Sequence, residues 1–412
     1  MRSYLKIPQL AGKSLHLGVT GSIAAYKALD LLRMWGEAGL MVSATLTESA
    51  RQFVQPLSFS SLGADPLYES MFINAGPAGH TGFAHLEPGQ LSGGMVIAPA
   101  TANFLAKLAC GLADDLLSCQ ALSFPGPLVI APAMNPRLWQ ATATQENWAK
   151  LKSRGHYLIE PEHGIVACGE EGRGRLPALE QIYLTALKAL TSHDLAGRRI
   201  LITLGPTREA WDPVRFWSNP SSGLMGASLA VTAWLRGARV TVVAGPVQDL
   251  WLPLEIERHD VVSAEEMFET CMDLWPGLDT ACFVAAVADF CPVPFGPDKF
   301  KKQSSPDGFN LQFVPNPDIL AEISKQARPD RNEVRIMAFA AETGLDQDML
   351  KLKLAGKGAD LLVANDLNQP GAGFAVDTNA VTVMDRQGRI ESWPVLPKPE
   401  VAWRLWDWLG QI

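Results

Sequence analysis

The 412-residue sequence has no Cys-x-x-Cys pair, no long apolar run and no excess of positive charge. Its six cysteines show no metal-binding spacing with histidine, which indicates free thiols rather than a zinc site or a disulfide framework. No apolar run approaches the ~20 residues that a membrane-spanning helix needs. The net charge of −8 argues against nucleic-acid binding, because nucleic-acid-binding proteins are usually basic. The first residues lack a signal peptide's apolar core, so we expect a cytoplasmic protein without a membrane partner.

The composition and length indicate a folded protein of more than one domain. Hydrophobic residues make up 47% of the chain and charged residues 19%, which is typical of a compact fold. A chain of this length favours two domains. Apolar density falls around residues 191–197, and a strand pattern then restarts. We therefore predict one domain over residues 1–192 and a second over residues 193–412.

Both halves alternate short β-rich runs with helical stretches. This rhythm predicts an α/β fold with two doubly wound, Rossmann-like domains, whose ligands bind beyond the carboxyl ends of parallel strands. A hairpin turning at residues 386–388 and a Trp-rich terminal helix follow the second sheet. The predicted strands cover residues 15–21, 41–47, 94–100 and 127–133 in the first half, and 198–205, 239–246, 280–290, 335–343 and 360–366 in the second.

Several residues after predicted strands of the first half suit a phosphate-bearing cofactor: Gly21, Ser22, Ile23, Thr47, Thr101 and Asn103. Free backbone N–H groups and the dipole at a helix start attract phosphate. Taken alone, these residues fit any mononucleotide fold. His85 and Asn135 add a group that handles a proton and a group that holds a carboxylate. The combination indicates a decarboxylase.

The motifs GVTGSIAAYK, HLEPG, APATANFLAK, PAMNPRLW and ACGEEGRGRL occur in this order over residues 15–190. In this the first half resembles the flavin-dependent cysteine decarboxylases. More narrowly, it is similar to the phosphopantothenoylcysteine decarboxylase half of the bifunctional coenzyme A biosynthesis proteins. Pro88 and Gln90 depart from the family pattern, outside the chemistry.

The resemblance implies that FMN is held by the six phosphate-site residues named above. His85 would be the catalytic histidine, and Asn135 would bind the substrate carboxylate. Cys168, on a glycine-rich flap, would donate a proton. Flavin oxidation of the substrate's CH2–SH to a thioaldehyde lets the electrons left by CO2 delocalise onto sulfur.

The second half carries a further set of phosphate-suited residues. Ser221, Ser222 and Gly223 follow a strand at a helix start, and Asp289 ends another strand. Residues 299–302, Lys-Phe-Lys-Lys, form a basic cluster in an acidic chain. Because it lies between Pro- and Ser-rich loops, we interpret it as a mobile phosphate clamp.

From residue 198 to about 400, the chain is similar to the phosphopantothenate–cysteine ligase half of the same family. The resemblance implies CTP and Mg²⁺: 4'-phosphopantothenate attacks CTP to give an acyl-cytidylate and pyrophosphate, and the cysteine amine displaces CMP. Asn219 would process the acyl-cytidylate, with Lys299 as a second catalytic residue. The metal ligands stay unassigned. The implied nucleotide contacts are Phe283, Val284, Ala285, Asp289, Lys299, Pro317, Asp318, Ile319, Leu320, Phe339, Lys353 and Lys357.

Two residues depart from the ligase pattern. Pro220 replaces a histidine, and Leu224 replaces a lysine at the start of the helix. Loss of a cation near a triphosphate weakens binding by ~1–3 kcal/mol. Alternatively, Leu224 packs into the helix start and neighbouring lysines compensate. We expect an active ligase, with a decarboxylase carrying an impaired ligase half as the alternative.

The same residues argue against other functions. The attached second half argues against a flavin prenyltransferase or a single-activity cysteine decarboxylase. A non-catalytic regulatory protein with this fold should lack the histidine, the asparagine or the cysteine, and all three are present. A nicotinamide-dependent oxidoreductase would have Gly-x-Gly-x-x-Gly, which is absent. The resemblance also implies a homo-oligomer, with trimeric decarboxylase and dimeric ligase parts that together form a dodecamer.

Overall fold

The computed structural model describes residues 2–71, 83–301, 303, 308–327, 334–344, 346–371, 373 and 376–412. Lys302 of the basic cluster lies outside the described residues. The chain divides into two compact units. The first unit comprises residues 8–192, and the second comprises residues 193–412 together with Arg2–Ile7.

The N-terminal segment differs from the predicted domain of residues 1–192, because it packs with the second unit. Its short 3-10 helix η1 (Ser3–Leu5) contacts helices α10 (Leu224–Leu235) and α14 (Lys398–Leu409). Tyr4 and Leu5 are buried, and the Tyr4 hydroxyl donates to the carbonyl of Trp251 at 2.7 Å. Burial of these two apolar side chains explains why the segment leaves the first unit.

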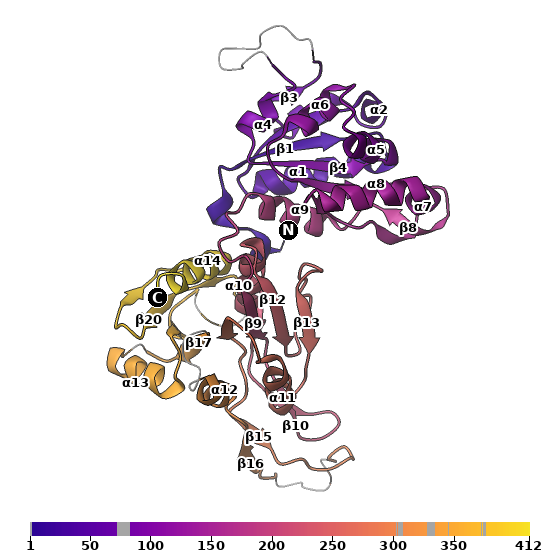
Figure 1. Ribbon diagram of the computed structural model, residues 1–412. Helices are drawn as coiled ribbons and strands as arrows, with labels where there is room; N and C mark the ends of the chain where they lie inside the picture. The colour runs from indigo at the N-terminus through magenta and orange to yellow at the C-terminus, as the bar shows by residue number, and fades with distance from the viewer. Residues whose placement is uncertain are drawn as a thin grey trace. The chain divides into compact units, whose positions relative to one another are not determined.

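The first unit is built on a parallel six-stranded sheet in the order β3-β2-β1-β4-β5-β6 (Figure 1). The order reverses between β1 and β4, where doubly wound folds bind ligands. Its strands are β1 (Ser14–Val19), β2 (Met41–Leu46), β3 (Leu67–Tyr68), β4 (Gly94–Ala100), β5 (Leu128–Pro132) and β6 (Tyr157–Leu158), and a separate hairpin pairs β7 (Glu162–Ile165) with β8 (Glu171–Arg175).

The helices of the first unit form two packed groups. Helix α1 (Lys27–Glu37) packs with α9 (Leu179–Ala189), and α5 (Ala102–Cys110) packs with α6 (Leu116–Ser123) and α8 (Thr142–Ser153). Alternate residues of β4 and β5 supply the core beneath the second group, because successive strand side chains point to opposite faces. The short helices are η2 (Pro8–Leu10), η3 (Ile23–Tyr26), α2 (Glu48–Arg51), α3 (Pro56–Ser61), α4 (Glu87–Leu91) and α7 (Pro136–Gln140).

The second unit carries an eight-stranded sheet in the order β13-β12-β9-β14-β17-β18-β20-β21 (Figure 1). The strands from β13 to β18 are parallel, and β20 and β21 are antiparallel. The six parallel strands have the same connectivity as the sheet of the first unit, with β9 in the place of β1. Their order reverses between β9 and β14. These strands are β9 (Arg199–Leu204), β12 (Arg239–Ala244), β13 (Glu257–Asp260), β14 (Thr280–Phe283), β17 (Arg335–Glu342), β18 (Leu361–Asp366), β20 (Val381–Asp385) and β21 (Ile390–Ser392).

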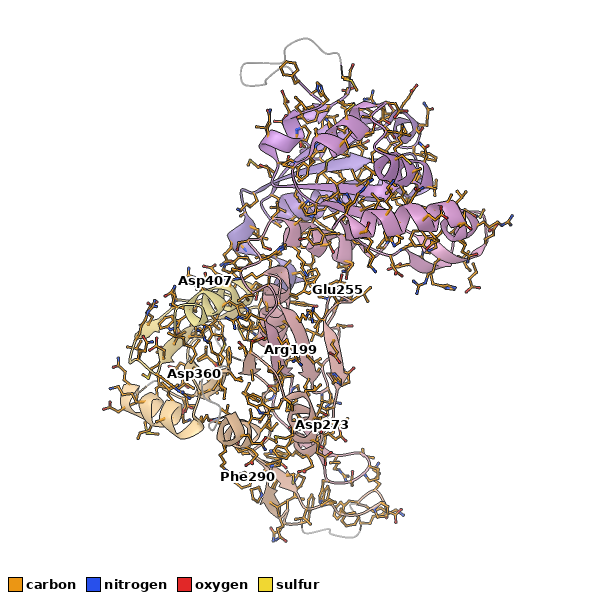
Figure 2. All side chains as sticks on the ribbon, in the orientation of Figure 1. Arg199, Glu255, Asp273, Phe290, Asp360 and Asp407 are labelled. Atoms are coloured by element: carbon orange, nitrogen blue, oxygen red, sulfur yellow. The ribbon has the colours of Figure 1, made fainter. Side chains whose placement is uncertain are left out.

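Further elements of the second unit cover and extend this sheet. Side chains fill the space between the helices and the sheet (Figure 2). None of the helices within the described ranges is both long and apolar enough to cross a bilayer. The remaining helices are α11 (Ala264–Leu274), α12 (Ile319–Ala327) and α13 (Gln347–Lys357), and small antiparallel pairs join β10 (Arg208–Ala210) to β11 (Phe216–Ser218), β15 (Phe290–Pro292) to β16 (Phe313–Pro315), and β19 (Thr378–Asn379) to β22 (Leu396–Pro397).

The predicted α/β class with two doubly wound sheets is confirmed, and one predicted strand is much too long. The strand predicted over residues 280–290 ends at Phe283. Beyond it, the backbone N–H groups of Val284 and Ala285 donate to the Thr203 hydroxyl at 3.1 and 3.2 Å. A side chain therefore replaces the neighbouring strand as the hydrogen-bond partner. The freed segment is available for a site.

Candidate functional site

The ends of β1 and β4 in the first unit are joined by one side chain. The Thr20 hydroxyl donates to the carbonyl of Pro99 at 2.7 Å and accepts from the backbone N–H of Thr101 at 3.0 Å. Thr20 is buried, so these bonds are shielded from water. They hold the two strand ends where the strand order reverses.

Short helices begin next to these strand ends, each capped by a predicted site residue. Ser22 caps η3, Thr47 caps α2 and Thr101 caps α5, with hydroxyl-to-N–H distances of 3.3, 3.2 and 3.3 Å. Capping satisfies only some of the free N–H groups at a helix start, so others stay available for an anion. Ile23 and Asn103 lie exposed beside them.

Gly21 shows that the backbone approach in this cradle is close. A Cβ atom on Gly21 would lie 2.4 Å from Cβ of Ser49, so any other residue at this position would displace one of the two segments. The turn after β1 therefore runs against the start of α2. Because parallel strands end at one edge, all six predicted FMN contacts lie at that edge of the sheet. Their donors and close backbone fit a cofactor phosphate.

Asn135 and Cys168 meet in the first unit. Asn135 Nδ2 donates to Cys168 Sγ at 3.2 Å and to Glu170 Oε2 at 3.2 Å. Asn135 Oδ1 accepts from the N–H of Arg137 at 2.8 Å, which caps α7 and orients the amide. The guanidinium of Arg137 in turn pairs with Glu170. The amide therefore faces an exposed thiol and a carboxylate.

The β7–β8 hairpin that carries Cys168 is anchored at its base. The N–H of Met134 donates to the carbonyl of Gly174 at 2.9 Å. A Cβ atom on Gly174 would lie 2.2 Å from the carbonyl oxygen of Met134, so this glycine permits the close approach. At the tip, Gly169 has φ of +84°, a left-handed conformation that favours glycine. The hairpin holds Cys168 at a tight turn over Asn135.

His85 lies elsewhere in the first unit. Ser123 and Gln120 of α6 donate to the backbone carbonyls of His85 and Ala84, at 2.9 and 2.8 Å. The ring makes an edge contact with Phe83, and its buried Nδ1 has no hydrogen-bond partner among the described residues. Helix α4, which follows His85, lies on the opposite side of the unit from α7 and β8 (Figure 1). One chain therefore does not unite His85 with Asn135 and Cys168.

The second unit contains a pocket of about 690 Å³ at the carboxyl edge of β9, β14, β17 and β18. Gly223, with φ of +74°, precedes α10 at its wall, and Leu224 begins that helix facing the pocket. Pro220 is exposed nearby. The structure gathers these predicted residues in the pocket lining: Asn219, Phe283, Val284, Ala285, Asp289, Pro317, Asp318, Ile319, Leu320, Phe339, Lys353 and Lys357.

Side-chain amides support the irregular loop that lines this pocket. Asn219 Nδ2 donates to the carbonyls of Ala286 and Val287, both at 3.2 Å. Asn316 Nδ2 donates to the carbonyl of Ala288 at 2.8 Å. These bonds replace the strand ladder that the loop lacks. They fix its backbone groups toward the pocket.

The charged residues of the pocket are partly paired. The ammonium group of Lys353 forms an ion pair with Glu342, a residue that our sequence reasoning did not select. Lys357, one turn further along α13, also lines the pocket. The sequence reasoning also missed Asn365, Asn379 and Lys398 of the lining. None of the three belongs to a motif that would identify it.

Lys299 lies exposed and is not among the residues that line the pocket. The next residue, Phe300, is buried against Trp211 and Phe309, at ring distances of 5.1 and 4.8 Å. Its N–H donates to the carboxylate of Asp212 at 3.1 Å. An aromatic cluster therefore anchors this segment. The expectation that Lys299 contacts the nucleotide pocket is not met in this conformation.

A second, more open hollow of about 410 Å³ shares Asn219 and Asp289 with the main pocket. Its wall is apolar, with Trp217, Phe290 and Phe313; Phe290 is labelled in Figure 2. Among the described residues, no group of three or more His, Cys, Asp or Glu side chains could hold a metal ion.

Comparison with known proteins matches both units. The family model "Flavoprotein" covers residues 7–191, and "DNA/pantothenate metabolism flavoprotein C-terminal domain" covers residues 195–412. A relative from Bacillus subtilis, named coenzyme A biosynthesis bifunctional protein CoaBC, is 39% identical over 96% of this chain and 96% of its own. Relatives of the same name from Escherichia coli K12 and Vibrio vulnificus CMCP6 are 39% identical over 92% of this chain, and over 92% and 93% of their own chains. The chain therefore belongs to the family of bifunctional coenzyme A biosynthesis proteins.

Proposed function

We propose that this enzyme joins 4'-phosphopantothenate to cysteine with CTP and then decarboxylates the product to 4'-phosphopantetheine. The meeting of Asn135 with Cys168 and Glu170 carries the decarboxylase assignment. The ligase assignment rests on the pocket between β9 and β18, which gathers the residues expected to contact the nucleotide. The expected FMN contacts after β1 and β4 and the ligase pocket lie where the strand order of their sheets reverses, and Asn135 follows the next strand, β5.

In the first unit, FMN would be held by the helix starts after β1, β2 and β4, and would supply two-electron redox chemistry. Asn135 Nδ2 bonds the Glu170 carboxylate at 3.2 Å, which marks a position that a substrate carboxylate could take. An amide donor binds this group without stabilising its charge as strongly as a guanidinium would. The exposed Cys168 thiol, next to the same amide, would then donate the proton that completes the product.

His85 would complete the decarboxylase site from a neighbouring copy of the chain. Within one chain, its segment lies on the far side of the unit from α7 and β8 (Figure 1). We infer a trimer for the decarboxylase part, dimers for the ligase part, and a dodecamer overall. Co-expressed His85→Asn and Cys168→Ser chains should regain 4'-phosphopantetheine formation that neither variant shows alone. No regain in verified mixed oligomers would contradict a shared site.

In the second unit, the triphosphate of CTP would lie near the start of α10, with Mg²⁺ on its phosphates. Backbone N–H groups after Gly223 and the helix dipole attract phosphate there. Lys353 and Lys357 line the same pocket and would balance the charge that develops when pyrophosphate leaves. Asn219, which already orients the loop after β14, would hold the acyl-cytidylate.

Purified protein tests both activities together. It should be yellow, with flavin absorption near roughly 450 nm. Addition of 4'-phosphopantothenate, cysteine, CTP and Mg²⁺ should release CO2, CMP and pyrophosphate. A colourless protein that takes up no FMN would contradict the decarboxylase assignment. Normal decarboxylation of phosphopantothenoylcysteine without CTP-dependent pyrophosphate release would indicate an impaired ligase half, as Leu224 could cause.

A further inference from the structure

One corner of the second unit's pocket has polar side chains that no nucleotide contact accounts for. Asn365 is the penultimate residue of β18, Asn379 ends β19, and Lys398 is the first residue of α14. All three line the pocket. They come from separate parts of the chain, and the register pair Asn379–Leu396 brings β19 next to the segment that leads into α14.

Two of these side chains are buried but form few hydrogen bonds. Asn379 and Lys398 are each only 4% exposed. The Asn379 amide oxygen has no hydrogen-bond partner among the described residues, so no bond at this oxygen fixes the amide, and its NH2 group can donate to a ligand in the pocket. The ammonium group of Lys398 donates to the carbonyl of Val376, which uses one of its three protons. A buried amide and a buried cation are costly to fold unless further partners satisfy them.

The buried ammonium group of Lys398 makes this corner of the pocket attractive to an anion. Lys353 is already paired with Glu342. Burial lowers the pKa of Lys398 to about 8, and the nearby Asp377 carboxylate opposes this shift. A bound anion would stabilise the protonated form of Lys398 further.

The position of α14 explains how Lys398 reaches the pocket. Helices α10 and α14 pack together, and Trp406 Nε1 donates to the Thr232 hydroxyl at 3.0 Å and to the carbonyl of Leu229 at 3.2 Å. Both helices begin at the pocket, where their first residues are Leu224 and Lys398. At the pocket, α14 therefore begins with a cation and α10 begins with an apolar side chain.

We propose that Lys398, Asn379 and Asn365 form a phosphoryl-binding subsite of the ligase pocket. Lys398 there supplies a cation that position 224 lacks. The inference rests on the proposed ligase function, because that reaction brings two phosphorylated molecules into one pocket. The phosphoryl group belongs either to the nucleoside triphosphate or to the phosphate monoester of the acid substrate.

Calorimetric titration of the full-length protein separates these two sources. CTP with Mg²⁺ and 4'-phosphopantothenate are each titrated into wild type, Lys398→Met and Lys398→Arg. Lys398→Met should weaken the affinity for one of the two ligands by about 10- to 100-fold, while Lys398→Arg stays within about fivefold of wild type. The weakened ligand identifies the source. Asn379→Asp, which adds a negative charge, should weaken the same ligand.

Lys351→Met is the matched control, because Lys351 lies on α13, pairs with Asp348 and does not line the pocket. It should bind both ligands like wild type. Folded Lys398→Met and Asn379→Asp proteins, shown by thermal unfolding, that bind both ligands like wild type would overturn the subsite. Wild type that binds neither ligand would instead overturn the proposed ligase function.

Discussion

The two units share a strand order but build their sites differently. Each sheet reverses its order beside its first strand, and the expected FMN contacts and the ligase pocket lie at the carboxyl ends of the strands there. In the second unit, the ends of four strands and the helices after them surround one pocket. In the first, Asn135 and Cys168 meet beneath a hairpin, and His85 stands on another side. A shared fold therefore locates a site without determining how many chains complete it.

The difference follows from where the chemical groups are attached. Residues at parallel strand ends converge, because the sheet places those ends along one edge. In the first unit, Asn135 follows the sheet strand β5, but Cys168 and His85 lie on segments outside the main sheet, the β7–β8 hairpin and the turn before α4. Such segments can face a neighbouring copy. If the two sites are separate, a substitution in one unit should leave the activity of the other unchanged.

Substitution of the hairpin thiol should separate the two activities most strongly. Cys168→Ser should lower the formation of 4'-phosphopantetheine by about 100- to 10,000-fold, because it removes a proton donor held by Asn135. The yield of 4'-phosphopantetheine from phosphopantothenoylcysteine measures the loss, and pyrophosphate release should stay unchanged. Cys110→Ser, at an exposed free cysteine, is the control and should leave both activities intact. Equal loss of both activities in Cys168→Ser would mean that the units are coupled.

Acid should destabilise the first unit through His16. Burial lowers the pKa of this histidine from 6.5 to about 3, and its Nδ1 lies 2.8 Å from the Ser43 hydroxyl. Between these pH values the unfolded chain binds the proton that the folded chain rejects, so stability falls as pH falls. From pH 7 to pH 4.5 this costs roughly 3 kcal/mol.

Urea unfolding of wild type and His16→Gln at both pH values measures this contribution. The variant should lose stability at pH 7 but show a smaller acid penalty than wild type. His163→Gln, at an exposed histidine in β7, should keep the full penalty. An unchanged penalty in His16→Gln would assign the acid sensitivity to other groups.

A substitution at the start of α10 should impair the ligase activity of the second unit and leave decarboxylation unchanged. In Gly223→Ala, the new Cβ would lie 2.9 Å from Val247 Cγ1 at a φ of +74°. The resulting shift of the helix start should reduce CTP-dependent pyrophosphate release by about 10- to 100-fold. Gly388→Ala carries similar backbone strain at φ of +88° in open space, so its ligation should match wild type. Loss of decarboxylation in Gly223→Ala would contradict independent sites.

The smallest effect is expected at the edge of the first site. Arg137→Met removes an ion pair with Glu170 in which the arginine side chain is 81% exposed. Such pairs contribute at most about 1 kcal/mol, so decarboxylation should fall no more than about fivefold. The ratio of kcat to KM for phosphopantothenoylcysteine measures it. A loss as large as that of Cys168→Ser would show that Arg137 itself contacts the substrate.

Sequence reasoning located most of the strands and most of the pocket lining, since both depend on local pattern. The buried runs at 94–100 and 128–132 are strands because apolar residues of that length must be covered on both faces. It extended the strand after Thr280 too far, because the Thr203 hydroxyl that ends it lies far away in sequence. It also missed Asn365, Asn379 and Lys398, whose roles depend on what surrounds them.

The chain's own pattern of apolar runs, glycines and motif residues determined the α/β class and both doubly wound sheets, and it supplied most candidate residues of each site. Those features depend on local periodicity and on chemical groups that are visible one by one. Only the folded structure decided that Arg2–Ile7 joins the second unit, that His85 stands apart from Asn135, and that Lys398 reaches the pocket. Each of these is a long-range contact or separation, set by packing between segments that no local pattern connects.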